Sequence, residues 1–208
     1  MLRRKSDRGF HPRQKGIREQ RQRFLIVCEG EKTEPQYFRA YSEYANVIEL
    51  DVRGAAGDPL GVVNRAIEVR DESRINLNMR KPYDQIWCVF DRDSVPAQRF
   101  NEAFALANRT GFRIAYSNEA FELWYLLHFN FYNTGISRAD YIEKLVPLLG
   151  HNYTKNSSSM YRELHTRQSD AIRNAHTLLA QYSPCHPVED NPSTTVHLLI
   201  EELNRFLV

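Results

Sequence analysis

Two acidic residues one position apart, Asp91 and Asp93, follow an apolar run over residues 85–90. If the chain stays extended there, both side chains project to the same side, with Cα atoms roughly 6–7 Å apart. Two like charges about 4 Å apart repel by on the order of 4 kcal/mol at an effective dielectric near 20, and a divalent cation removes that repulsion. Carboxylates with retained waters suit Mg²⁺ or Mn²⁺. The pair therefore predicts a metal site; the alternative is an acidic turn paired with Arg92.

A third acid, Glu29, follows another apolar run over residues 24–28. A run of this length, rich in β-branched residues, is typical of a strand buried on both faces of a parallel sheet. Open α/β sheets bind their ligands at the carboxyl ends of strands. If the two strands are neighbours, Glu29, Asp91 and Asp93 share one crevice, an arrangement that serves metal-assisted phosphoryl transfer. The alternative is a strand–loop–helix corner with solvated acids.

The segment after Glu29 supplies three second-tier candidates, Glu31, Lys32 and Glu34. Glu34 follows Thr33, a candidate helix cap, so it equally suits interaction with the helix N-terminus. Lys32 is a candidate phosphate contact, although an exposed lysine is more often only solvated. These three residues therefore rank below Glu29.

Three further candidates lie later in the chain: Glu122, His128 and Lys155. Glu122 has apolar neighbours and needs a partner or a metal, because burying an unpaired carboxylate is costly. Asn118, four residues earlier, is a candidate hydrogen-bond partner. His128 lies about 120° round the helix from Glu122, which favours a core histidine. Lys155 lies in a polar loop, where it could neutralise a phosphate.

The elements that must position these residues alternate between strand and helix as far as residue 118. We expect strands over 24–28, 47–52, 85–90 and 112–116, with helices over 35–46, from Pro59, and over 96–109. Short connections between them indicate an α/β fold with a mainly parallel sheet of about four strands flanked by helices. Helix caps are predicted at Thr33, Asp58 and Ser137, and helix ends at Gly111 and Gly150.

From residue 118 onward the pattern predicts helices only, over 120–129, 137–149 and 169–182, with a last one starting at Ser193. The expected organisation is a basic, flexible arm over 1–22, an α/β core over 23–130 and a helical C-terminal extension over 131–208 that packs on the core. The last helix is apolar along one face, so it must pack against the body.

The charge is unevenly distributed along the chain. Residues 1–23 carry nine Lys and Arg against two acids, whereas the rest carries 19 basic and 24 acidic residues. Such an arm suits non-specific phosphate contacts whose affinity falls steeply with salt, and the alternative is a solvated tail. The candidate nucleic-acid-binding residues are Arg3, Arg4, Lys5, Arg8, Arg13, Lys15, Arg18, Arg21 and Arg23.

Composition excludes several classes of protein. A hydrophobic content of 42% and an aromatic content of 12% argue against wholesale disorder. No apolar run approaches the roughly 20 residues of a membrane span, and the N-terminus lacks the apolar centre of a secretion signal. Three cysteines without metal-type spacing, two of them in strand-like runs, favour a reduced, cytoplasmic protein. No Walker-type glycine loop appears, so we do not expect this chain itself to hydrolyse ATP.

Glu29-Gly30 after one apolar strand and Asp91-x-Asp93 after another resemble the TOPRIM arrangement of topoisomerases, primases and OLD-type nucleases. The chain resembles the RloB family more closely, and the similarity extends from residue 24 to about 195. The matching stretches are Phe24 to Pro35, Gly57-Asp58-Pro59, Trp87 to Asp93, Ser117 to Phe129, Tyr153-x-Lys155 and Asn191-Pro192-Ser193-Thr194.

The resemblance implies a TOPRIM-like fold and a nuclease effector of abortive infection or anti-phage defence, working with an SMC/ABC-like ATPase encoded nearby. It also implies acid–base chemistry at Glu29 and metal binding at Asp91 and Asp93, and it strengthens Lys155 as a phosphate contact. Glu119 stands where the family's Ser-Asn-Pro motif has proline, a departure expected to alter a helix start without removing chemistry.

The leading hypothesis is therefore a Mg²⁺- or Mn²⁺-dependent nuclease acting on DNA or RNA, with Glu29 serving both the metal and the acid–base step. The alternative is a non-catalytic regulatory or scaffold subunit that keeps the acidic pocket as a metal-stabilised binding site. A nucleotidyl- or phosphotransferase is a third, weaker hypothesis, because the same carboxylates could serve it. Whether the chain forms a homo-oligomer stays open.

Overall fold

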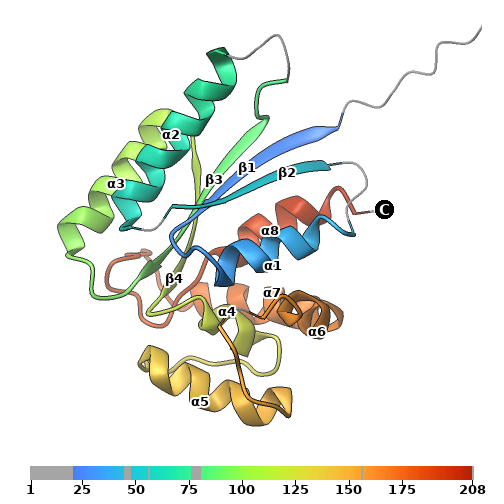
Figure 1. The fold of residues 1–208 in the computed structure, drawn as a ribbon. Helices are drawn as coiled ribbons and strands as arrows, with labels where there is room; N and C mark the ends of the chain where they lie inside the picture. The colour runs from blue at the N-terminus through green and yellow to red at the C-terminus, as the bar shows by residue number, and fades with distance from the viewer. Residues whose placement is uncertain (1–20, 45–47, 56, 76–80, 156, 208) are drawn as a thin grey trace, which may run out of the picture.

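The computed structural model describes residues 21–44, 48–55, 57–75, 81–155 and 157–207. Most of the predicted basic arm therefore lies outside the described residues. Figure 1 shows one sheet with helices on both faces and a group of further helices gathered beyond one end of it.

Four parallel strands form the sheet in the order β2-β1-β3-β4. They are β1 (Gln22–Cys28), β2 (Ile48–Gly54), β3 (Gln85–Arg92) and β4 (Arg113–Asn118). The register sets Cys28, the last residue of β1, opposite Gly54 of β2 and Val89 of β3. The predicted parallel α/β sheet is confirmed, and β1 and β3 are neighbours whose carboxyl ends meet at one edge.

The apolar run of β1 feeds two cores because successive side chains of a strand point to opposite faces. Leu25 and Val27 pack under α2 (Pro59–Ile75) and α3 (Ala97–Thr110). Phe24, Ile26 and Cys28 face α1 (Thr33–Tyr41) and α8 (Val196–Asn204) on the other side. Figure 1 shows these two helix pairs on opposite faces of the sheet. Burial on both faces explains why this strand carries no polar alternation.

The remaining helices are α4 (Glu122–Leu127), α5 (Arg138–Leu149), α6 (Met160–Leu164) and α7 (Gln168–Leu179), with a 3₁₀ turn at His165–Arg167. Every residue of α4 is buried, and it packs against both α5 and α7. α4 follows β4 directly, so it begins at the carboxyl edge of the sheet and carries Glu122 there. Within the described part of the chain, no helix has the length and apolar content of a bilayer span.

Several predicted caps are confirmed. Asp58 accepts a hydrogen bond from the Gly61 amide at 2.8 Å, and Ser137 forms a capping box with Asp140. Gly111 and Gly150 follow α3 and α5 in the left-handed region, with φ of 73° and 76°. Glycine adopts this conformation without steric penalty, which is why the sequence marks these ends clearly.

Other boundaries differ from prediction. Thr33 does not cap α1; it is the first helical residue, and its hydroxyl donates to the Lys155 carbonyl at 2.7 Å. α1 ends at Tyr41 instead of continuing to residue 46, and residues 45–47 lie outside the described residues. α4 is shorter than predicted. Ser193 does not begin the last helix, because Thr194 first forms an antiparallel bridge with Ser117, and α8 begins at Val196.

Candidate functional site

A pocket of about 290 Å³ opens at the carboxyl ends of β1 and β3, where the loops leading to α1, α4 and α5 converge. Five residues with carboxyl side chains and two with basic side chains line it. The lining residues are Glu29, Gly30, Thr33, Glu34, Asp91, Asp93, Phe121, Glu122, Arg138 and Lys155. The three first-choice acids predicted from the sequence thus lie in one pocket.

Glu29 directly joins the two strand ends. Its amide donates to the Val89 carbonyl at 2.8 Å, and its Oε2 accepts from the Asp91 amide at 3.0 Å. Burial raises the pKa of Glu29 to about 7; Asp93 and Glu34 add to the rise, while the Asp91 amide and Arg138 oppose it. A carboxyl group that titrates near neutral pH is suited to both accepting and returning a proton.

Asp91 and Asp93 share one guanidinium partner, Arg138. Arg138 Nη2 lies 3.0 Å from Asp91 Oδ2 and 3.6 Å from Asp93 Oδ2, and it also donates to the Glu119 carbonyl at 3.0 Å. Burial and the charges of Glu34, Glu122 and Glu29 still raise the pKa of Asp91 well above its usual range, against the opposing effect of Arg138. One arginine therefore only partly compensates this buried carboxylate.

Glu34 and Glu122 complete the acidic wall. Glu34 in α1 is buried against Gly30, where an added Cβ would press on the Glu34 carboxyl group and displace it. Burial, followed by the charge of Glu122, raises the pKa of Glu34. Glu122 is also buried and accepts from the Tyr153 hydroxyl at 2.9 Å. The prediction that Asn118 bonds to Glu122 is wrong, because Asn118 Oδ1 instead accepts from the Ser193 amide and hydroxyl.

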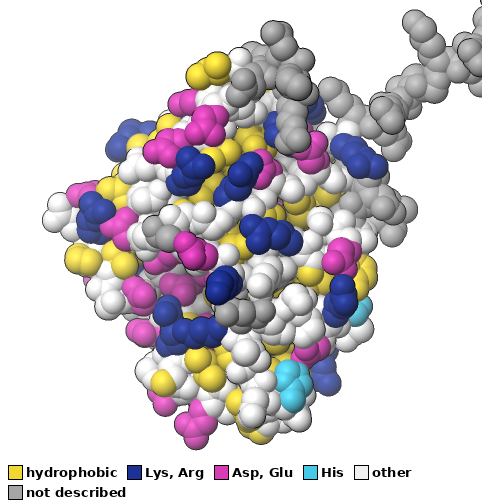
Figure 2. All heavy atoms as spheres, viewed as in Figure 1, with side chains coloured by type: hydrophobic (Ala, Val, Ile, Leu, Met, Phe, Trp, Pro, Cys, Tyr) yellow, Lys and Arg dark blue, Asp and Glu magenta, His cyan; other side chains and the backbone are white. Residues whose placement is uncertain are grey.

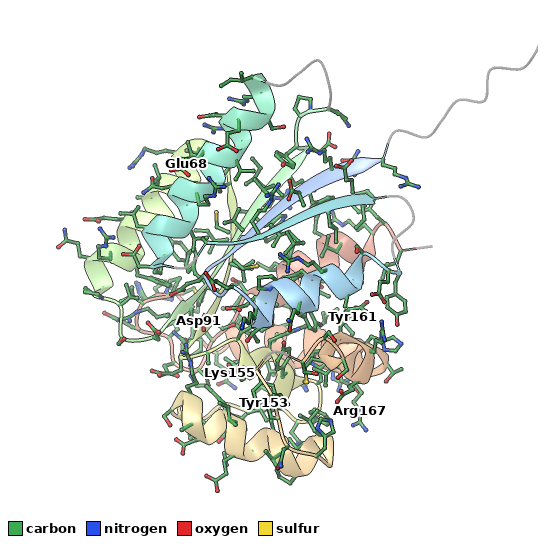
Figure 3. The ribbon with its side chains drawn as sticks, viewed as in Figure 1. Glu68, Asp91, Tyr153, Lys155, Tyr161 and Arg167 are labelled. Carbon is green, nitrogen blue, oxygen red and sulfur yellow. The ribbon has the colours of Figure 1, made fainter. Side chains whose placement is uncertain are left out.

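Lys155 reaches the pocket from the loop between α5 and α6. The Thr33 hydroxyl holds its carbonyl, so the loop is tied to the start of α1. Figure 3 shows Lys155 and Tyr153 below Asp91, between the edge of the sheet and α5. The structure thus brings this predicted lysine to the pocket that holds Asp91 and Asp93, which lie more than 60 residues earlier in the sequence.

Three second-tier residues lie elsewhere. Glu31 and Lys32 are exposed and are not among the residues that line the pocket. His128 is buried in the core, where its Nδ1 bonds to the Trp124 carbonyl at 2.9 Å and its ring meets the Trp124 ring edge to face. Burial lowers the pKa of His128 to about 4. The structure therefore favours the core-histidine interpretation over a site role.

The predicted nucleic-acid role of Arg23 is contradicted. Only 3% of this residue is exposed; its guanidinium donates to Glu49 at 3.0 Å and to the Lys81 carbonyl at 2.5 Å, and lies over the Tyr83 ring. Arg21 is exposed, and the other seven candidates, from Arg3 to Arg18, lie outside the described residues. Figure 2 shows basic and acidic side chains interspersed over the face in view, with several Lys and Arg near its middle.

Sequence reasoning missed Arg138 as a site residue. The capping box at Ser137 makes Arg138 the first residue of α5, and from there Arg138 lines the pocket. The cap was visible in the sequence, but nothing local distinguishes Arg138 from an exposed arginine. The role of Tyr153 as the donor to Glu122 was also missed, although Tyr153-x-Lys155 was among the matching stretches.

Glu119 departs from the family motif for a backbone reason. Its φ is 60°, in the left-handed region, and its amide donates to the Arg92 carbonyl at 2.9 Å. Proline can adopt neither this φ nor this hydrogen bond. The Glu119 carbonyl in turn accepts from Arg138, so the backbone at this position helps to place an arginine that lines the pocket.

The pocket's donor set suits a hard divalent cation. All five acids offer oxygen ligands, and the raised pKa values of Glu29, Glu34 and Asp91 reflect burial and repulsion that a cation would relieve. Among the described residues, however, no three of these acids hold their oxygen atoms all within 4.8 Å of one another. Arg138 pairs with both Asp91 and Asp93, so its positive charge stands where a shared cation would neutralise the two carboxylates.

A family model described as RloB-like protein matches residues 24–203 of this sequence. The chain belongs to the RloB-like family. The match covers both strand ends, α4 and Tyr153-x-Lys155, so every element that lines the pocket of this RloB-like chain lies within it.

No curated protein matches the RloB-like chain in sequence. One solved structure, the crystal structure of a sigma-54 interaction domain protein from Enterococcus faecalis, aligns over 61% of this chain and 87% of its own, at 11% identity and a TM-score of 0.25. A similarity this low carries no argument about function.

Proposed function

We propose that this RloB-like protein is a metal-dependent nuclease with a TOPRIM-like active site, acting in anti-phage defence together with an SMC/ABC-type ATPase. One observation carries the proposal: Glu29 and the Asp91-x-Asp93 pair, 62 residues apart, meet at adjacent strand ends, joined by the hydrogen bond from the Asp91 amide to Glu29. Family membership supports the setting in defence, and the pocket's chemistry supports hydrolysis of a phosphodiester.

Asp91 and Asp93 are the residues that would hold Mg²⁺ or Mn²⁺, with Glu29 as a further ligand. When bound there, the ion would neutralise phosphate oxygens and make a water molecule more acidic. The pocket's size is compatible with this assignment, since about 290 Å³ has room for a hydrated ion and one phosphate.

Glu29 supplies the acid–base step in this proposal. Burial gives Glu29 a pKa of about 7, which a bound cation would lower, so Glu29 would be ionised at neutral pH and able to take the proton of the attacking water. The P–O bond to the leaving oxygen then breaks, and the protonated Glu29 can return the proton to that oxygen. One residue thereby closes the proton balance, and water is consumed.

Lys155 and Arg138 supply positive charge to the substrate. Lys155 faces the pocket from the loop opposite the sheet and is placed to neutralise a phosphate oxygen. Arg138 holds Asp91 and Asp93 in the ion-free chain; once a cation takes over that compensation, its guanidinium is free to pair with a phosphate. The same arginine would thus link metal binding to substrate binding.

A cleavage assay with purified, untagged protein tests the proposal, with and without the ATPase encoded nearby. Labelled DNA and RNA are incubated with Mg²⁺ or Mn²⁺, and Glu29→Gln is compared with Glu31→Gln, a neighbouring exposed acid outside the pocket. We expect wild type and Glu31→Gln to cleave, and Glu29→Gln to lose roughly 10²–10⁴-fold in rate. Equal cleavage by the two variants would refute the assignment of Glu29.

The Arg138 ion pair also favours a second candidate, a non-catalytic subunit whose acids bind a cation or an arginine without breaking a bond. In such a subunit a guanidinium would lie among the acids of the pocket, as Arg138 does beside Asp91. Phage challenge separates the two functions. Asp93→Asn abolishes protection if the site is catalytic, whereas protection that survives together with an unaltered complex with the ATPase supports the scaffold.

A further inference from the structure

A cluster of two histidines and one glutamate lies on α7 and α8, outside the acidic pocket. His176 comes from α7, while His197 and Glu201 come from α8, four residues apart and therefore on one helix face. One ligand atom of each residue lies within 4.8 Å of those of the other two. The helices pack against each other, so the cluster bridges two elements that are separate in sequence.

His197 is the unexplained member of this cluster. It is completely buried, and among the described residues neither of its ring nitrogens has a hydrogen-bond partner of regular geometry, although the Thr194 backbone lies close enough to influence its ring. A buried imidazole without partners is unfavourable because its polar atoms have lost their contact with water. The ring lies 4.4 Å, centroid to centroid, from that of His176.

His176 and Glu201 form the open side of the cluster. His176 Nε2 lies 2.9 Å from Glu201 Oε1, with His176 exposed and Glu201 partly exposed. An ordinary surface ion pair accounts for these two residues alone and leaves the buried ring of His197 unexplained. A metal ion accounts for all three, and exposed His176 and partly exposed Glu201 give it a path from solvent.

We propose that His176, His197 and Glu201 form a transition-metal site, with Zn²⁺ as the preferred ion. Two imidazoles and one carboxylate are a three-ligand set that zinc accepts, with water completing the tetrahedron. Imidazole nitrogen favours Zn²⁺ over Mg²⁺, so this site and the acidic pocket would select different ions.

The protonation of His197 is compatible with metal binding. Burial, and secondarily the nearby His176, lower the pKa of His197 to about 4, so its ring is neutral near pH 7 and has a lone pair to offer. The bound ion would fasten α8 to α7. The segment leading into α8 carries Thr194, whose bridge to Ser117 braces β4 just before α4. The proposed ion would therefore stabilise the support of the acidic pocket without taking part in its chemistry.

Zinc binding to the full, untagged chain tests the proposal, after stripping with a chelator. Equilibrium dialysis with elemental analysis gives the stoichiometry, and Co²⁺ replaces Zn²⁺ as a visible probe of tetrahedral coordination. We expect one Zn²⁺ per wild-type chain and a higher melting temperature with Zn²⁺ than without. His176→Gln and Glu201→Gln should bind roughly 100-fold more weakly or worse, because even second-shell partners cost 10–100-fold in affinity.

The chain offers a matched control. His151 Nε2 lies 2.8 Å from Glu163 Oε2, which is the same surface pair without a buried third ligand. His151→Gln should leave Zn²⁺ stoichiometry and affinity unchanged, and an Asp91→Asn/Asp93→Asn variant should also retain the ion. Zinc binding that is absent in wild type, undiminished in His176→Gln, or lost in His151→Gln would overturn the site.

Discussion

The Arg138 guanidinium lies 3.0 Å from Asp91 and 3.6 Å from Asp93. The positive charge of this side chain therefore stands where the proposed metal ion would neutralise the two carboxylates. Arg138 comes from the first turn of α5, and both acids come from the end of β3. The pocket is thus built from the sheet edge and the C-terminal helices together.

Replacing Arg138 by Gln should have opposite effects on stability and on metal affinity. Without a divalent ion, the free energy of unfolding should fall by about 1–3 kcal/mol, because the buried Asp91 carboxylate loses its partner. Mg²⁺ affinity should rise, since the ion no longer competes with a guanidinium. Chemical unfolding and calorimetry measure the two quantities. Arg65→Gln, which removes an exposed pair with Glu68, is the control; matching results for both variants would contradict the competition.

The pH dependence of stability should reflect the crowded acids. Glu29 has a pKa of about 7 in the folded chain against an ordinary value of 4.5, so the folded state binds its proton more tightly than the unfolded state does. This contribution lowers stability as pH rises from about 4.5 through about 7. Glu29→Gln should flatten that part of the profile, and so should Mg²⁺. Buried His128 and His197, with pKa values of about 4, contribute in the opposite sense, so the measure is the difference between wild type and Glu29→Gln in melting temperature from pH 4 to pH 8, with and without Mg²⁺. Parallel profiles for the two proteins would be inconsistent with the raised pKa of Glu29.

Tyr153→Phe should destabilise the pocket wall. The substitution removes the hydroxyl that donates to the buried Glu122 carboxyl group at 2.9 Å, a loss expected to lower the free energy of unfolding by about 1–3 kcal/mol. A double-mutant cycle with Glu122→Gln isolates the interaction. Tyr44→Phe removes a hydroxyl from an exposed ring and should have little effect. Additive effects of the Tyr153 and Glu122 substitutions would show that the bond contributes nothing.

Two substitutions at Glu119, whose backbone is left-handed, should change the free energy of unfolding in opposite directions. Glu119→Gly should raise the free energy of unfolding by about 1 kcal/mol, because glycine adopts φ of 60° without the penalty of a side chain. Glu119→Pro should lower it, because proline excludes this φ and removes the donor to the Arg92 carbonyl. Denaturant unfolding of the two variants checks both signs. Stabilisation by proline would mean that the backbone here follows the family motif after all.

The sheet was predictable because its signals are local. The unbroken apolar runs of β1 and β3 mark strands buried on both faces, and Gly111 and Gly150 mark helix ends through their backbone freedom. Parallel strands then bring their carboxyl ends to one edge, which is why Glu29 and Asp91 were expected to lie together if their strands were neighbours, as β1 and β3 are. Ser137, a favourable helix N-cap, likewise predicted the start of α5 from a local signal.

The contacts that complete the pocket were not predictable, because they depend on packing between distant segments. Thr33 has the side chain of a helix cap, yet its hydroxyl bonds to Lys155 once the later loop folds over it. Asn118 was four residues from Glu122, the right spacing for a helix, but it lies before the helix and holds Ser193 instead. Arg23 was predicted to bind nucleic acid with the basic arm, but in the folded chain its guanidinium bonds to Glu49 and lies over the Tyr83 ring.

The most direct test of the proposed metal site is a titration of the full, untagged chain with Mn²⁺, monitored by loss of the sharp paramagnetic resonance signal of the free ion. We predict that wild type and Glu31→Gln each bind an ion that Mg²⁺ displaces, and that Asp91→Asn/Asp93→Asn does not. His176→Gln, at the separate histidine cluster, should bind Mn²⁺ as wild type does. Equal Mn²⁺ binding by wild type and the double variant would contradict a metal site at the end of β3.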